Sequence, residues 1–212
     1  VIKTGDAGSA LLAAICAPTL NNNEKVHVVS SGVGSKSVLK GLEDYYVVVH
    51  SDSGDPELTD VSEHAASMVD NSVRQAGYIS AEPVAFANVI DASVGDEQTI
   101  RVIGESLVKT ANKHGLAIMN GELAILGSRV NAPANVSGTM ISLVNKNSTF
   151  ARNIERKIFS MTSGSKKHFY AIFDPAGQPV SINSDGVGTK TDFNIRAYLT
   201  AHFNESVLAW SL

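Results

Sequence analysis

The sequence predicts an α/β fold, with a mixed β-sheet of long apolar strands and helices packed on one of its faces. Residues 45–49 and 84–90 are rich in β-branched, aromatic and other apolar side chains, as expected for buried strands. Residues 59–76 and 96–114 instead repeat apolar side chains at helical spacing. Strands and amphipathic helices that alternate along one chain are typical of an α/β domain.

The composition narrows the class of protein. The chain has 212 residues, of which 43% are hydrophobic and 18% charged, enough for one large domain or two small ones. A net charge of −4 without a Lys/Arg cluster argues against a nucleic-acid partner. The lone Cys16 excludes an internal disulfide and fits a reducing cytosol. The apolar run around it is too short to span a bilayer, so we expect a cytoplasmic protein without a membrane partner.

The helices are predicted from their apolar spacing and their end signals. Residues 5–17 are helix formers that Asp6 or Ser9 could cap. The helix over 59–76 would begin at Asp60 or Ser62, and the helix over 96–114 would end at Gly115. Cys16 lies in the first of these helices, where we expect a packed core thiol.

Further strands are predicted on either side of these helices. Residues 26–29 would form an early strand, and residues 116–125 a later one that runs into a glycine–glutamate turn. Residues 136–144 and 169–173 have the same strand composition. The polar, basic residues 145–168 between them are predicted to be a linker or a surface helix.

One glycine-rich segment, residues 183–192, carries more groups that could bind a metal ion or a phosphate than any other segment. Asp185 can hold a hard cation such as Mg²⁺ through oxygen. The glycines after it let backbone N–H groups approach an anion, and the threonine and lysine add a hydroxyl and a positive charge. On spacing alone, a glycine turn with a solvated lysine is an equally good interpretation. The predicted phosphate-binding residues are Gly186, Val187, Gly188, Thr189 and Lys190.

The sequence Ser-Asp-Gly-Val-Gly-Thr-Lys at 184–190 resembles the signature of the aminoimidazole ribonucleotide synthetase (phosphoribosylformylglycinamidine cyclo-ligase) family. Its ATP-binding superfamily also includes formylglycinamidine ribonucleotide synthetase, selenophosphate synthetase and thiamine-phosphate kinase. Ala-Glu-Pro at 81–83 and Asn-Gly-Glu at 120–122 resemble two further motifs of the family. The resemblance covers most of the chain but only the ATP-binding half of the enzyme.

The resemblance implies an α/β ATP-binding domain that forms a homodimer through its sheet. It implies a cyclo-ligase that converts formylglycinamidine ribonucleotide to aminoimidazole ribonucleotide and releases ADP and phosphate. The nucleotide substrate is a small molecule, and no general base can be named. By resemblance, the Mg²⁺ that accompanies ATP is held by Asp185, Glu122 and Asp70.

Several positions depart from the family pattern. A similar segment at 30–37 has Ser31 where Asp185 stands, so it is either a degenerate second copy or a coincidence. The family has an Asn-Asp or Asp-Asp pair where this chain has Asp70-Asn71, so the acidic residue has moved or exchanged places. Leu123 replaces the threonine that follows the family's glutamate. The family's second-domain signature is missing. The alternatives are therefore a catalytically reduced homologue that binds nucleotide or pairs with a partner, and another ATP-dependent synthetase or kinase of the superfamily.

The order of the motifs also differs from that of the family, where the glycine-rich segment comes first. We interpret residues 1–150 as an ATP-binding-like domain with a degenerate first loop, and residues 151–212 as the part that carries the intact loop. This second part could begin a repeat, complete the first domain by circular permutation, or serve a partner subunit.

Overall fold

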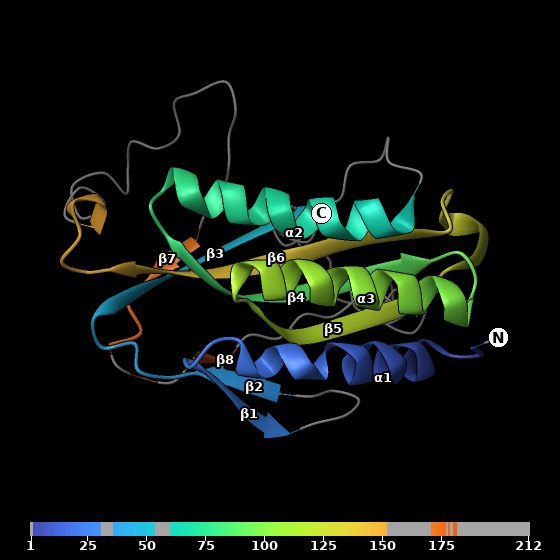
Figure 1. The fold of residues 1–212 in the computed structure, drawn as a ribbon, viewed down its shortest axis with the longest axis horizontal. Helices are drawn as coiled ribbons and strands as arrows, with labels where there is room; N and C mark the ends of the chain where they lie inside the picture. The colour runs from blue at the N-terminus through green and yellow to red at the C-terminus, as the bar shows by residue number, and fades with distance from the viewer. Residues whose placement is uncertain are drawn as a thin grey trace, which may run out of the picture.

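The computed structural model describes most of the first 151 residues and a short part of the C-terminal region. The described ranges are 2–30, 36–53, 60–151, 171–176, 178 and 180–181. Their strands form two sheets, shown in Figure 1. The main sheet has the order β5-β4-β6-β3-β7, and the small sheet has the order β1-β2-β8.

The main sheet is mixed, as predicted. Its strands are β3 (Tyr45–Ser53), β4 (Glu82–Ala92), β5 (Ala117–Ile125), β6 (Ala134–Asn145) and β7 (Ala171–Phe173). β4 and β5 are parallel, whereas β6 is antiparallel to both β4 and β3, and β7 is antiparallel to β3. The small sheet is antiparallel and consists of β1 (Val26–Ser30), β2 (Lys36–Leu39) and β8 (Val180–Ser181).

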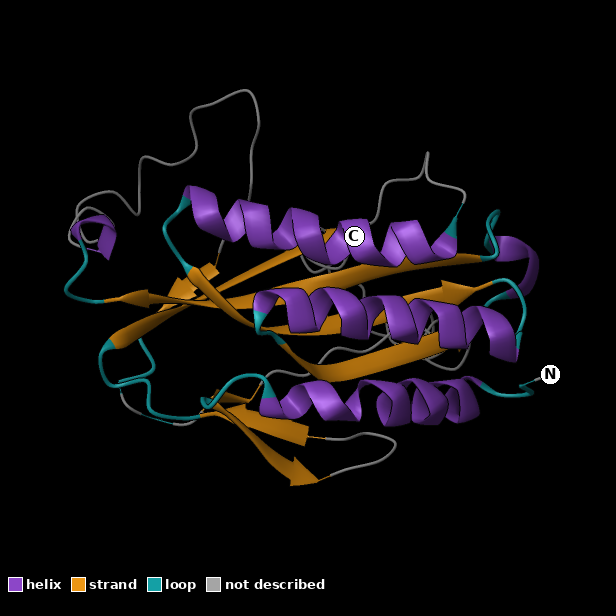
Figure 2. Ribbon diagram, viewed as in Figure 1, coloured by secondary structure: helices purple, strands orange, loops and turns teal. Residues whose placement is uncertain are grey.

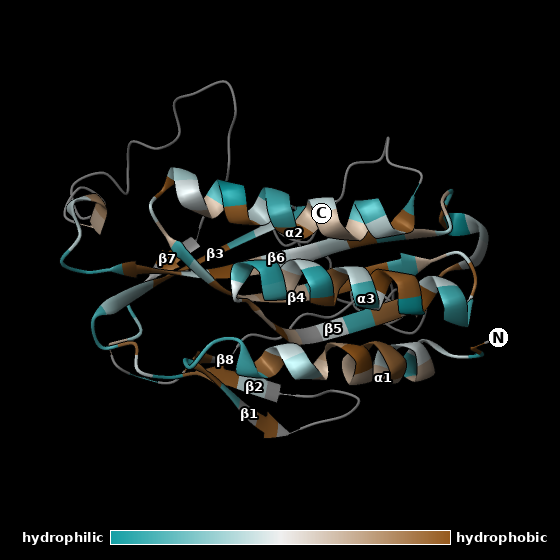
Figure 3. Ribbon diagram, viewed as in Figure 1, coloured by the Kyte–Doolittle hydropathy of each residue, from teal (hydrophilic) through white to brown (hydrophobic). Residues whose placement is uncertain are grey.

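The helices α1 (Gly5–Cys16), α2 (Val61–Tyr78) and α3 (Glu97–His114) lie side by side on one face of the main sheet (Figure 2). This arrangement confirms the predicted fold class. Short 3₁₀ helices, η1 (Ala17–Asn21) and η2 (Gly127–Arg129), follow α1 and β5. In Figure 3, α1 is largely hydrophobic, whereas α2 and α3 carry many hydrophilic residues on the side toward the viewer.

The helix ends follow local chemistry. Asp60 caps α2 by accepting hydrogen bonds from the N–H groups of Ser62 and Glu63. Gly115 ends α3 in the left-handed region, with φ of 65°, and so confirms the helix end predicted at this glycine. The predicted cap of α1 was wrong: Thr4 rather than Asp6 or Ser9 accepts the hydrogen bond, from the N–H of Ala7.

The largest core lies between the helices and the main sheet. Its members include Leu12, Met68, Phe86, Ile103 and Leu123, all at most 1% exposed. Cys16 belongs to this core, and burial raises the pKa of its thiol to about 12, which confirms the predicted core thiol. A second core lies on the opposite face, where the small sheet packs on one end of the main sheet through Val26, Leu39, Val84, Leu143 and Val180.

Candidate functional site

The glycine-rich segment 183–192 lies outside the described residues, and so do Asp185 and the phosphate-binding residues predicted after it. The structure describes the strand that leads to it. Ser181 of β8 is the Cα partner of Val38 in β2, and Val180 is the partner of Leu39. β8 therefore enters the small sheet two residues before the segment begins.

The similar segment at 30–37 begins at the end of β1, the other neighbour of β2, and its residues 31–35 lie outside the described residues. β1 runs antiparallel to β2 and ends at Ser30, the Cα partner of Lys36. Because β8 is also antiparallel to β2, β1 and β8 run in the same direction on either side of it. Ser30 and Ser181 are the last described residues before the two glycine-containing segments. The two strands that end there therefore finish at the same end of the small sheet.

Glu122 lies inside β5, opposite Val89 of β4. Its neighbour Leu123 is fully buried in the core under the helices, and the Leu123 N–H donates a hydrogen bond of 2.9 Å to Ser9 Oγ of α1. Because side chains alternate along a strand, Glu122 is directed to the opposite face of the sheet, where it is half-buried. This is the face on which the small sheet packs.

The prediction of a glycine–glutamate turn within 116–125 was wrong, since β5 continues through these residues. The strand instead has an irregular register: Phe86 pairs with Ile118, while Ala87 pairs with Asn120. Gly121 is required for a different reason, because a Cβ at this position would lie 2.7 Å from Asn88 Oδ1. The glycine leaves room for a buried amide rather than for a turn.

Asp91 is a further polar group on the face of Glu122 that the sequence interpretation missed. Its neighbours Ile90 and Ala92 belong to the helix-side core, so Asp91 is directed to the other side. It is half-buried, and burial raises its pKa. A carboxylate inside an apolar run, at a position that alternates with core residues, was the signal available in the sequence.

Hydroxyl groups add to the polar character of this face. Ser51 Oγ and Thr139 Oγ1, on the paired strands β3 and β6, are 2.7 Å apart. Among the residues that the structure describes, no three histidine, cysteine, aspartate or glutamate side chains gather to hold a metal ion. Glu122 and Asp91 therefore provide two carboxylates on one face of the sheet. Among the described residues, no third histidine, cysteine or carboxylate joins them.

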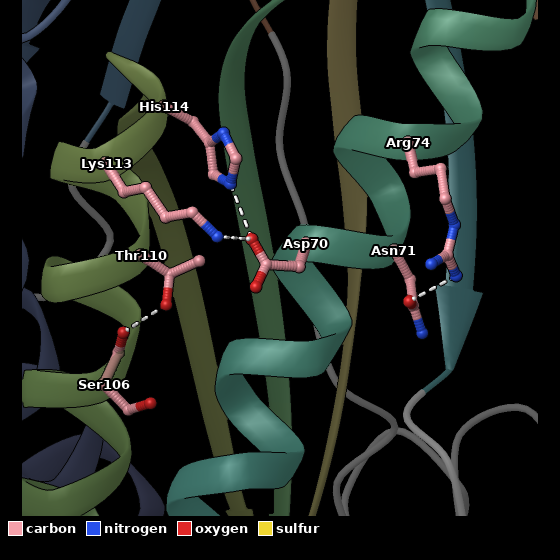
Figure 4. Close-up of polar contacts among 7 residues, drawn as sticks. All are labelled: Asp70, Asn71, Arg74, Ser106, Thr110, Lys113 and His114. Carbon is pink, nitrogen blue, oxygen red and sulfur yellow. Dashed lines mark hydrogen bonds and ion pairs between the residues drawn. The ribbon is translucent and has the colours of Figure 1, made fainter.

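Asp70 lies in a different place. It projects from α2 toward the C-terminal turn of α3, where its Oδ1 accepts contacts from Lys113 Nζ at 2.9 Å and His114 Nε2 at 2.6 Å (Figure 4). Burial acts to raise the pKa of Asp70, but the hydrogen bonds from His114 and Lys113 outweigh it, and the net effect lowers the pKa. Asp70 thus joins two neighbouring helices.

The structure does not bring Asp70 and Glu122 together. Asp70 contacts α3 within the helical layer, whereas Glu122 is directed to the face of the sheet that the helices leave free. The adjacent Asn71 is also engaged, since its Oδ1 accepts a hydrogen bond of 2.7 Å from Arg74. The described geometry therefore separates two of the three residues that the family resemblance assigned to one metal ion.

No helix in the described ranges combines the length and the apolar character needed to cross a membrane.

Three solved structures of other proteins are partly similar to this chain. Thiamine-monophosphate kinase from Stenotrophomonas maltophilia superposes with a TM-score of 0.52 and 18% sequence identity, over 65% of this chain and 42% of that one. HypE of E. coli, a hydrogenase maturation protein, has a TM-score of 0.49 and 14% sequence identity, over 65% of this chain and 44% of that one. Phosphoribosylformylglycinamidine synthase II from Thermotoga maritima has a TM-score of 0.40 and 22% sequence identity, over 52% of this chain and 20% of that one.

Neither a family model nor a curated protein matches the sequence. The chain spans less than half the length of each of these structures. At this level of identity the likeness concerns the fold alone. The chain therefore has the mixed-sheet, one-sided helical fold found in part of thiamine-monophosphate kinase.

Proposed function

We propose that the chain is the nucleotide-binding part of an ATP-dependent enzyme, in which residues 185–190 and Glu122 hold the phosphates of ATP and their Mg²⁺. The observation that carries this proposal is an arrangement on one side of the main sheet. The small sheet, whose strand β8 leads to the glycine-rich segment, packs on the same face to which Glu122 is directed. Both ligand sources would then approach one nucleotide from one side.

Each group has a distinct task in this proposal. Asp185 and Glu122 would supply carboxylate oxygens, the ligand type that Mg²⁺ prefers. The backbone N–H groups of Gly186, Val187 and Gly188 would donate to phosphate oxygens, and Thr189 and Lys190 would add a hydroxyl and a cation. Bound Mg²⁺ would neutralise negative charge on the phosphates during transfer.

Asp70 is no longer placed beside these ligands. The family resemblance assigned it to the metal, and we now propose that it acts as a link between α2 and α3. Its carboxylate already contacts two basic side chains, and the main sheet lies between the helical layer that holds it and the face of Glu122. Substitution of Asp70 should therefore change stability more than nucleotide affinity.

For the reaction, we favour ring closure of formylglycinamidine ribonucleotide with release of ADP and phosphate. The support is the match of residues 185–190 to the signature of the cyclo-ligase family. The chain would activate the amide oxygen of the substrate by transferring phosphate to it, and loss of that phosphate would accompany ring closure. We further propose a cytoplasmic homodimer formed through the sheet face that carries Ser51 and Thr139.

A second candidate is a kinase that transfers phosphate to a small phosphorylated acceptor. The fold likeness to thiamine-monophosphate kinase, with a TM-score of 0.52, favours it. A third candidate is a nucleotide-binding homologue without catalysis. The core position of Leu123, where the family has threonine, favours this one.

Product identification separates these candidates. The chain is incubated with ATP and Mg²⁺ and, in parallel, with formylglycinamidine ribonucleotide or thiamine monophosphate. Formation of aminoimidazole ribonucleotide in step with phosphate release is the result we expect. A diphosphate product without free phosphate would replace the ligase by the kinase, and ATP binding without turnover on either substrate would favour the non-catalytic homologue.

A further inference from the structure

Residues 171–181 connect the two sheets of the molecule. β7 pairs with β3 at the edge of the main sheet, and β8 pairs with β2 in the small sheet (Figure 1). Each strand also contributes a side chain to a core: Ile172 packs with Val48 and Val144, and Val180 packs in the core beneath the small sheet. The segment is therefore attached at both ends to the body of its own chain.

A polar contact joins the turn between these strands to the body. Lys146, just after β6, places its Nζ 2.7 Å from Asp174 Oδ1 and donates a hydrogen bond of 2.9 Å to the Glu43 carbonyl. The same ammonium group lies 5.6 Å from the centre of the Tyr46 ring. Lys146 is thus bound to the residues before β3 and to the residue that follows β7.

Asp174 in turn shapes the connection to β8. Its Oδ1 also accepts a hydrogen bond of 2.8 Å from the Ala176 N–H, and the Gln178 N–H donates to the Pro175 carbonyl at 2.9 Å. The hydrogen bond from Lys146, followed by the one from Ala176, lowers the pKa of Asp174. One carboxylate oxygen therefore couples the position of Lys146 to the local fold of the turn.

We infer that Lys146 is a positioning residue, which through Asp174 sets where β8, the strand that precedes the glycine-rich segment, enters the small sheet of its own chain. This inference rests on the proposed function for the role of that segment. It selects one of the three interpretations of the motif order, in which the C-terminal part completes the first domain within the same molecule. A truncated repeat or a loop that serves a partner would not need this attachment.

Engineered cysteines test the attachment independently of nucleotide. Val38 and Ser181 are direct Cα partners on antiparallel strands, a separation that a disulfide can bridge. The native Cys16 is buried, with a thiol pKa of about 12, so it should not compete. Mild oxidation of the Val38→Cys/Ser181→Cys variant should give a disulfide within one chain. A disulfide between two chains, or none, would overturn the inference.

Charge variants test the role of Lys146. Lys146→Met keeps the aliphatic stem, and Lys25→Met is the matched control, because Lys25 Nζ lies 4.6 Å from the Tyr45 ring centre in a similar contact. Lys146→Met should slow formation of the disulfide and weaken ATP binding by about fivefold at most, the range of an exposed ion pair. Asp174→Asn should have the same effect, because it removes the negative charge that Lys146 contacts.

The outcomes separate the inference from the proposed function. Equal disulfide rates in Lys146→Met and Lys25→Met would overturn the positioning role, whatever the ATP affinity. If no variant binds ATP while the disulfide forms within one chain and depends on Lys146, the attachment stands and the proposed function fails.

Discussion

Replacement of Leu123 by alanine tests the placement of Glu122 through its neighbour. Leu123 is fully buried between β5 and α1, close to Gly8 and Ile100. A leucine-to-alanine change at such a site costs about 3 kcal/mol of unfolding free energy. For a chain of this length, about 3 kcal/mol corresponds to a fall of roughly 6–12 °C in the midpoint of thermal unfolding.

The assay is thermal and urea unfolding followed by circular dichroism, with two comparison variants. Glu122→Gln, on the opposite face of the same strand, should change the unfolding free energy by less than about 1 kcal/mol. Val94→Ala, at a residue that is 60% exposed, should change it by less than about 0.5 kcal/mol. A loss below about 1 kcal/mol for Leu123→Ala would refute the register of β5, because a shift by one residue exchanges the faces of Leu123 and Glu122.

Three other substitutions and one chemical treatment probe separate features. Asp70→Asn should lower stability near neutral pH by about 1 kcal/mol or less, since the ion pairs are partly exposed. Because the folded pKa of Asp70 is lowered, this difference should shrink as pH falls below the unfolded value of 3.8, as measured by unfolding at several pH values. Cys16 should resist a thiol reagent at pH 8 in the native protein and react with one equivalent after unfolding, because burial raises its thiol pKa to about 12. Gly121→Ala should cost about 1–3 kcal/mol through its clash with Asn88, whereas Gly77→Ala, with no atom within 4 Å of the added Cβ, should stabilise α2 by about 0.5–1 kcal/mol.

The features that depend on neighbouring residues in sequence could be predicted. Apolar spacing placed α2 and α3 within about two residues, and the end signals at Asp60 and Gly115 are confirmed. The long apolar strands β3 and β4 were found by composition for the same reason, since burial on a pleated surface selects β-branched and aromatic side chains. Local chemistry was sufficient for the elements themselves.

Contacts between distant residues could not be predicted in this way. The partners of Asp70, Lys113 and His114, are more than 40 residues away in sequence, so its helix–helix contact appears only once α2 and α3 are packed. The register irregularity between β4 and β5 likewise depends on pairing, and it let an apparent glycine turn continue as a strand. The attachment of β7 and β8 joins residues more than 120 positions apart, which no local pattern indicates.

The central claim is that the glycine-rich segment and Glu122 form one Mg²⁺-dependent nucleotide site. Calorimetric titration of the wild type with ATP, with and without Mg²⁺, tests it most directly, alongside Asp185→Ala, Glu122→Gln and Asp70→Asn. We predict binding that requires Mg²⁺, that Asp185→Ala and Glu122→Gln both lose, and that Asp70→Asn retains. No binding by the wild type, or equal binding by all of these variants, would contradict the claim.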